Sequence, residues 1–153
     1  MTERNTVHAV FTIERTYAAA PARVFAAWAD KEAKSRWFGA DKSAERQPEM
    51  DFRVGGRERL SGTWHGDGVL VRFEAHYFDI LPNERLVYAY DMYLGDQHIS
   101  VSLATVEFRP AGAGTRLVVT EQGTFLDGYD DAGSREHGTG WLLEKLGNSL
   151  EAA

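Results

Sequence analysis

The sequence predicts an α+β domain in which a curved antiparallel sheet of about seven strands packs against one long carboxy-terminal helix. The first observation is a stripe in residues 133–150, where apolar side chains recur at helical spacings of three and four, at Leu142, Leu143, Leu146 and Leu150. The second is the run of alternating β-branched and aromatic segments at residues 46–125, which alone offers a flat apolar surface for that helix. The function is expected to lie between the sheet and the helix.

The size and composition of the chain predict one domain over residues 1–153, with a core that needs no crosslinks. Cysteine is absent, which excludes disulfides, thiolate nucleophiles and thiolate metal sites. The amino-terminal segment lacks the basic start and apolar run of a signal peptide, and no window approaches the roughly 18 apolar residues of a membrane span. These features predict a cytoplasmic protein without a membrane span.

The charge and the aromatic content favour a small molecule over a polyanion as the partner. The formal net charge of −6 opposes the phosphate neutralisation that dominates nucleic-acid affinity, so nucleic acid is not expected to bind. Aromatic residues make up 12% of the chain, and aromatic rings with polar tips suit a wall that is partly apolar and partly wet. The alternative interpretation is that these rings simply fill the core.

The first third of the chain predicts one strand followed by two short helices. Residues 6–17 alternate apolar and polar side chains, which is typical of a half-buried strand. Pro21 suits the first position of a helix that ends near Asp30. Asp30 can cap a second short helix over residues 31–38, which Gly39 ends. Two short helices in tandem are expected to brace one end of the sheet.

The middle of the chain predicts a hairpin. Residues 49–54 and 57–64 flank the Gly-Gly pair at 55–56, and glycines accept the positive φ angles that a two-residue hairpin turn needs. Residues 40–48 have no apolar periodicity and are expected to form a loop. Residues 65–68 are expected to form a second turn.

The rest of the sheet is expected to be a meander. Four further strands are predicted at residues 69–81, 85–94, 98–109 and 115–125. The apolar parity changes near His76 and Tyr77, which predicts a bulge or bend there, and again between Leu103 and Val106, which predicts a bend. The short links predict antiparallel pairing of neighbours. An acidic loop over residues 123–133 leads into the terminal helix.

Several phrases carry a resemblance to a known family: DFRVGGRERL at 51–60, DILPNERLVYAY at 79–90, TVEFRPAGAGTRLVVTEQG at 105–123 and GWLLEKLGNSL at 140–150. Together with the element order, they resemble the SRPBCC superfamily, which has the START-like or helix-grip fold, and within it the branch named for the activator of the heat-shock ATPase. The resemblance covers roughly residues 8–150. It implies a deep apolar cavity between sheet and helix, which relatives use for lipids, sterols, polyketides and other hydrophobic molecules.

The patterns of common catalytic and metal sites do not occur in the chain, so no metal and no cofactor are expected. The five histidines form no HxH or HxxxH pair and lie on different expected elements, at His8, His65, His76, His98 and His137. The glycine-rich stretches join strands and do not open a helix as a phosphate-binding loop does. None of the serines lies in a GxSxG context.

Six side chains are candidates to bind a ligand, because the expected fold places them around one chamber: Trp37, Phe38, Tyr88, Tyr90, His137 and Trp141. Trp37 and Phe38 end the second short helix, and Tyr88 and Tyr90 share a strand face. His137 and Trp141 are four residues apart on the terminal helix and are therefore neighbours on its surface. The alternative is that these side chains only pack the core.

Acid/base chemistry in the cavity is also open. Several ionisable residues lie on expected strands, and any that faces inward would be desolvated and shifted in pKa: Arg72, His76, Asp91, His98 and Glu121. Two ionisable cavity groups within hydrogen-bonding reach of each other would indicate an enzyme.

Three functions follow from these observations. The favoured one is a carrier or sensor that binds a small hydrophobic or aromatic molecule without turnover. The second is a polyketide cyclase- or dehydratase-like enzyme that uses an inward His or Asp. The third is a stress-related, co-chaperone-like module that meets a protein partner, or a second copy of itself as a homodimer, through its sheet or acidic loop. A closed, dry core would favour this third function, and an open aromatic cavity without paired ionisable groups would favour the first.

Overall fold

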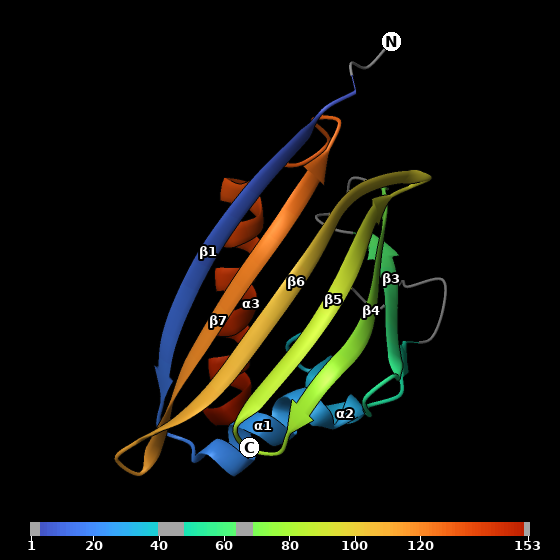
Figure 1. Ribbon diagram of the computed structural model, residues 1–153. Coiled ribbons are helices and arrows are strands. Elements are labelled where there is room, and N and C mark those ends of the chain that lie inside the picture. Colours follow the sequence, from blue (N-terminus) through green and yellow to red (C-terminus); the bar gives the residue numbers. More distant parts are fainter. Residues whose placement is uncertain (1–3, 40–47, 64–68, 152–153) are drawn as a thin grey trace.

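The computed structural model describes residues 4–39, 48–63 and 69–151, and it forms a curved sheet with three helices (Figure 1). The elements follow the chain as β1 (Thr6–Tyr17), α1 (Pro21–Ala29), α2 (Lys31–Ser35), β2 (Glu49–Met50), β3 (Arg57–Thr63), β4 (Leu70–Leu81), β5 (Arg85–Leu94), β6 (Gln97–Ala111), β7 (Gly114–Leu126) and α3 (Ala132–Glu151). The helix α3 lies on one face of the sheet, and α1 and α2 lie at one end of it (Figure 1).

The sheet has seven antiparallel strands in the order β1-β7-β6-β5-β4-β3-β2. The strands β2 to β7 are therefore a meander, and β1 adds to it beside β7. This confirms the predicted fold class, an α+β sheet with a long carboxy-terminal helix packed on it. In the part of the chain that the structure describes, no helix is long and apolar enough to cross a membrane.

The predicted start of the chain is confirmed, with one change at α2. The strand β1 has the predicted bounds, and α1 begins at Pro21. Asp30 caps α2, because its carboxylate accepts a hydrogen bond from the backbone N–H of Ala33 at 3.0 Å. The helix α2 ends at Ser35, earlier than predicted, so that Trp37 lies in the turn that follows it.

The predicted hairpin is confirmed by the antiparallel pairing of β2 with β3, but the two-residue turn predicted at the Gly-Gly pair is wrong. Only the pairs Glu49 with Arg59 and Met50 with Glu58 join β2 to β3, so residues 51–56 form a longer connection. The backbone of Tyr77 in β4 holds this connection in place. Its carbonyl accepts a hydrogen bond from the Gly55 N–H at 2.9 Å, and its N–H donates to the Gly56 carbonyl at 3.1 Å. The glycines therefore pair with β4, and the turn at this point is closed by the Gly56 N–H, which donates to the Arg53 carbonyl at 2.8 Å, with Gly55 at a positive φ of 85°.

Two further expectations concern segments outside the described residues. The predicted loop at residues 40–48 lies outside the described ranges except for its last residue, and the turn predicted at 65–68 lies wholly outside them.

The predicted bulge in β4 is confirmed one residue beyond its expected position. The register between β4 and β5 shifts between Tyr77 and Asp79. Phe78 is the extra residue of this bulge, and its side chain points out of the core and is 61% exposed. The alternation of inward and outward side chains along β4 therefore changes at this position.

The bend predicted in β6 between Leu103 and Val106 is wrong. Ser100, Ser102 and Ala104 continue the same buried face as Val106, while Leu103 is 39% exposed on the other face. The irregularity lies earlier in the strand, where the register with β5 shifts between Met92 and Tyr93. The inner face of β6 is therefore partly polar.

The helix α3 is anchored by its carboxy-terminal half. Its predicted apolar stripe is buried at Leu143, Leu146 and Leu150, whereas Leu142 is only partly buried. The hydroxyl of Tyr17 donates to the backbone carbonyl of Leu143 at 2.6 Å, which fixes the helix to β1. The helix begins at Ala132, so the loop before it is shorter than predicted.

Two glycines of α3 give a test of this anchoring. An added Cβ at Gly147 would lie 2.9 Å from a ring carbon of Tyr17, so Gly147→Ala is expected to lower the free energy of unfolding by about 1 kcal/mol or more. Nothing lies within 4 Å of a Cβ at Gly138, so the control Gly138→Ala is expected to stabilise by about 0.5–1 kcal/mol through helix propensity. Urea unfolding measures both. Equal shifts would show that Tyr17 does not fix the helix.

Candidate functional site

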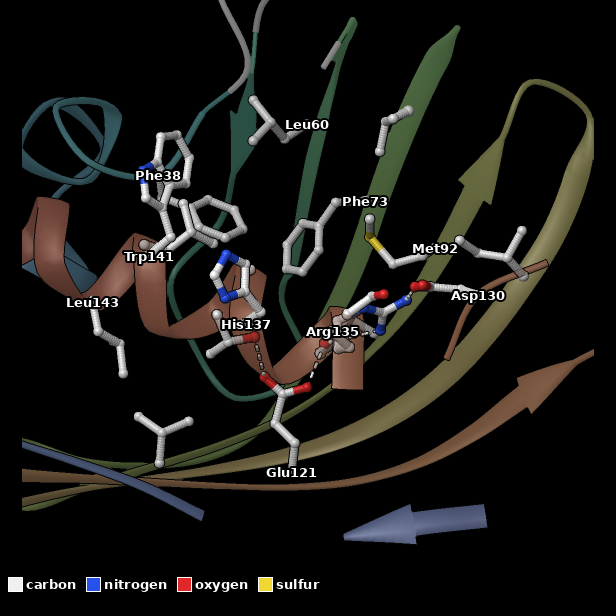
Figure 2. A pocket seen from close by; sticks show the side chains of 18 of the residues that line it. Phe38, Leu60, Phe73, Met92, Glu121, Asp130, Arg135, His137, Trp141 and Leu143 are labelled. Atoms are coloured by element: carbon white, nitrogen blue, oxygen red, sulfur yellow. Dashed lines mark hydrogen bonds and ion pairs between the residues drawn. The ribbon is translucent and has the colours of Figure 1, made fainter. Parts of the chain in front are cut away.

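A cavity of about 490 Å³ lies between the inner face of the sheet and α3 (Figure 2). One side of it is apolar and carries rings and aliphatic chains from the segment after α2 and from β3, β4 and β5, among them Phe38, Leu60, Phe73 and Met92. The other side is polar and carries Glu121 of β7 and the first turns of α3. The space beneath the helix is therefore a hollow with two chemically different walls.

All six predicted ligand-binding residues line this cavity: Trp37, Phe38, Tyr88, Tyr90, His137 and Trp141. Trp37 is buried, and its indole N–H donates to the Ala27 carbonyl at 2.9 Å. His137 and Trp141 are exposed, with Trp141 at 45%, and mark the mouth of the cavity. The structure brings the six together, and their contact with a ligand stays a prediction.

Glu121 is one of the five ionisable strand residues that the sequence indicates as possible inward groups, and the sequence does not distinguish it from the other four. In the structure it faces the cavity. Its carboxylate is 4% exposed and accepts a hydrogen bond from the hydroxyl of Tyr90. The hydroxyl of Thr139 donates to its other oxygen over 3.5 Å, which is a weak contact. Burial raises the pKa of Glu121 above its ordinary value, although the Tyr90 hydrogen bond and the Arg135 charge act in the opposite direction. Burial also raises the pKa of Tyr90.

Arg135 holds the polar wall together. Its guanidinium donates to the hydroxyl of Ser100 at 2.8 Å and to the carboxylate of Asp130 at 2.8 Å. It also donates to the Tyr90 hydroxyl at 3.2 Å and approaches the Ser102 hydroxyl at 3.5 Å. We call these five residues the Arg135 cluster. It explains why serines, and not the neighbouring valine and leucine, face inward on β6.

The other four ionisable strand residues do not enter the cavity. Arg72 and His76 lie on the opposite face of β4 from the cavity-lining Phe73. His98 and Asp91 form a contact of 2.7 Å with each other at partly exposed positions. Of these five strand residues, only Glu121 lines the cavity, so the inward side chain is a glutamate and not the His or Asp of the enzyme hypothesis. Two other ionisable residues line the cavity from outside the strands: Asp130 lies in the loop before α3, and His137 lies on α3.

A second buried polar cluster lies near the aromatic wall. The ammonium of Lys34 lies 2.5 Å from a carboxylate oxygen of Glu58, and the hydroxyl of Tyr77 donates to the same oxygen at 2.5 Å. Burial and the Glu58 charge raise the pKa of Tyr77. The Lys34 ammonium is also 4.6 Å from the ring centroid of Phe38. This cluster therefore fixes a ring of the cavity wall.

Removing one partner of this buried pair is expected to be costly. Lys34→Met leaves the Glu58 carboxylate buried without its cation, so we expect a loss of about 3–5 kcal/mol in the free energy of unfolding. The control Arg53→Met breaks an exposed pair with Asp51 and is expected to cost less than about 1 kcal/mol. Chemical denaturation of both variants measures the difference. A small effect of Lys34→Met would show that the Lys34 ammonium is not needed to stabilise the buried Glu58 side chain.

Within the described ranges, no three His, Asp or Glu side chains are placed to hold a metal ion. The described lining of the cavity offers hydrogen-bonding groups, ring faces and the buried carboxyl group of Glu121. The condition set for the enzyme hypothesis, two ionisable groups in contact, is met by Glu121 and Tyr90.

A curved antiparallel sheet with a long helix packed across it defines the helix-grip class of domains, here of the SRPBCC superfamily. Residues 18–151 match the family model described as activator of Hsp90 ATPase homolog 1-like protein, and the chain belongs to this family. This confirms the resemblance drawn from the sequence. Among curated proteins, no sequence matches the chain significantly.

Solved structures extend the comparison. An uncharacterised protein from Rhizobium leguminosarum is 46% identical, with a TM-score of 0.92 over 99% of this chain and 100% of that one. A protein from Rhizobium loti is 47% identical, with a TM-score of 0.87 over 95% of this chain and 99% of that one. A protein from Chromobacterium violaceum is 21% identical, with a TM-score of 0.72 over 91% of this chain and 94% of that one, and shares the fold.

Proposed function

We propose that the domain binds a small hydrophobic or aromatic molecule in the cavity between the sheet and α3. The observation that carries the proposal is the hollow itself. Protein interiors are close-packed, and an unfilled space costs stability because the side chains around it lose contacts. A cavity of about 490 Å³ lies within the range of small-molecule sites, and its aromatic lining suits a ligand with an apolar ring.

The mouth residues support the same conclusion. Trp141 is a large apolar side chain that is 45% exposed, although it lies beside the buried stripe of α3. A bound ligand would cover part of this ring. The closed, dry core that would favour an interaction module is absent from the described part of the interior, because the space under α3 is open.

A fluorescence titration tests the proposal. The neutral dye N-phenyl-1-naphthylamine, which brightens in apolar surroundings, is expected to bind saturably with one site per chain. Trp141→Ala removes a ring at the mouth and is expected to weaken binding by about three- to tenfold, because its apolar contact area is lost. The matched control is Phe78→Ala, which removes a ring that is 61% exposed at the β4 bulge and does not line the cavity. An absence of saturable binding, or equal weakening by both variants, would contradict the proposal.

One observation favours a second function, proton transfer on a bound molecule. Glu121 is a buried carboxyl group in contact with the Tyr90 hydroxyl, and a raised pKa suits a general base. A nitro-substituted benzisoxazole is a suitable probe, because a base removes its ring C–H proton while the N–O bond breaks to give a cyanophenolate.

The probe reaction is expected to depend on Glu121. Since only the ionised carboxylate acts as the base, the rate is expected to rise as the pH rises through the pKa of Glu121. Glu121→Gln keeps the shape and should reduce the protein-dependent rate to background, as measured by absorbance of the product. Equal rates in the two proteins would assign the cavity to binding alone.

A further inference from the structure

The ionic balance of the cavity shows which kind of ligand it accepts. Three charged side chains line its polar wall from the described elements: Glu121, Asp130 and Arg135. Arg135 is paired with Asp130 at 2.8 Å and reaches Glu121 only through the Tyr90 hydroxyl between them. Among the described residues Glu121 forms no ion pair, so this wall has an excess of negative charge when the Glu121 carboxylate is ionised.

The hydrogen bonds of Glu121 leave it as an acceptor. A carboxylate offers about four acceptor positions on its two oxygens. Here one oxygen accepts from Tyr90, and the other has only the 3.5 Å contact with Thr139. Figure 2 shows the carboxyl group rising from β7 into the space beneath α3. A ligand that donates hydrogen bonds can therefore complete it, and a positively charged one also compensates its charge.

An anionic ligand finds no comparable partner. An arginine has five N–H donors, and the guanidinium of Arg135 already directs its two terminal nitrogens at Tyr90, Ser100, Ser102 and Asp130. A carboxylate placed near it would also face Asp130 and Glu121, and like charges in a desolvated site repel strongly. His137 lines the exposed mouth, so the buried part of the described wall favours cations.

The aromatic wall suits a cation as well. The ring of Tyr90 lies 5.0 Å from that of Phe73 and 6.1 Å from that of Tyr88, so several ring faces adjoin the carboxylate. Ring faces carry negative charge density and attract ammonium groups within about 6 Å of the ring centroid. The apolar wall and Glu121 thus favour different parts of one molecule.

We propose that the cavity is selective for molecules that join an aromatic body to a protonated amine, and that Glu121 receives the amine. This inference rests on the proposed binding function and deepens it. The aromatic body contacts Phe38, Phe73 and Trp141, while the ammonium group donates to the free acceptor positions of Glu121.

Displacement of the neutral dye by three probes of similar shape tests the inference: the amine 2-(1-naphthyl)ethylamine, the alcohol 2-(1-naphthyl)ethanol and the carboxylate anion of 1-naphthaleneacetic acid, here called the acetate. Near neutral pH, the amine is expected to bind at least about tenfold more tightly than the acetate, with the alcohol between them. Glu121→Gln removes the charge and keeps the shape, and it is expected to weaken amine binding by about tenfold and to lower the ratio of amine affinity to acetate affinity accordingly.

Asp130→Asn is the reciprocal variant. It removes the counter-charge of Arg135 and leaves its guanidinium uncompensated. Acetate binding is therefore expected to strengthen by several-fold and amine binding to weaken, so the amine-to-acetate ratio falls in both variants for different reasons. Because Asp130 is partly exposed, the asparagine side chain is tolerated without burial of an unpaired group.

The pH dependence adds a second readout. The groups around Glu121 are Tyr88 and Tyr90 of β5, Arg135, His137 and Thr139 of α3, and Asp130 of the loop before it. Because burial raises the pKa of Glu121, its carboxyl group becomes neutral at a higher pH than an ordinary glutamate, and amine binding is expected to weaken as the pH falls through that value. Glu121→Gln should remove this part of the dependence.

The outcomes are distinct. Dye binding with an amine preference that Glu121→Gln removes supports the inference. Dye binding in which amine and acetate compete equally, or in which Glu121→Gln weakens all probes alike, overturns the inference and leaves the proposed binding function in place. No dye binding at all would overturn the proposed function itself.

Discussion

The structure depends on the unequal attachment of α3 to the sheet. The carboxy-terminal half of the helix is held by apolar burial of Leu143, Leu146 and Leu150 and by the Tyr17 hydrogen bond. The amino-terminal half has no fully buried side chain, and its main tie to the sheet is the guanidinium of Arg135. A polar side chain of this length holds the helix at a distance that leucine packing would not allow. The cavity lies beneath that half of the helix for this reason.

The Arg135 cluster therefore sets both the shape and the polarity of the site. Its members come from β5, β6, the loop before α3 and α3 itself, so the contacts join segments that are far apart in the sequence. A buried guanidinium needs all of these acceptors, since an unsatisfied buried charge costs far more than a hydrogen bond returns. Ser100 and Ser102 are small enough to sit under the helix and supply two of them. Because these two side chains are small, they also leave room for a ligand.

The sequence predicted the fold well wherever one face of an element is strongly apolar, as in β1 and in the leucine stripe of α3. It failed where a polar residue faces inward. The exposed Val101 and Leu103 looked like the core face of β6, because the acceptors of a distant arginine cannot be recognised from local alternation. The aromatic lining was predictable, since ring positions follow from strand parity and helix spacing. Glu121 was not, because a glutamate on a strand normally faces water, and only the partner contacts with Tyr90 and Arg135 distinguish it.

Glu121 links the stability of the domain to its occupancy. Its pKa is raised in the folded protein, so the folded state favours the protonated form, and its stabilising effect is full below the unfolded pKa and is lost as the pH rises through the folded pKa. At a pH above the folded pKa, the empty domain therefore holds an ionised carboxyl group in an environment that disfavours it. A residue that served packing alone would carry no such cost. A ligand that binds the carboxylate removes the cost and stabilises the fold by mass action, so the residue that destabilises the empty cavity is also the one that discriminates among its occupants.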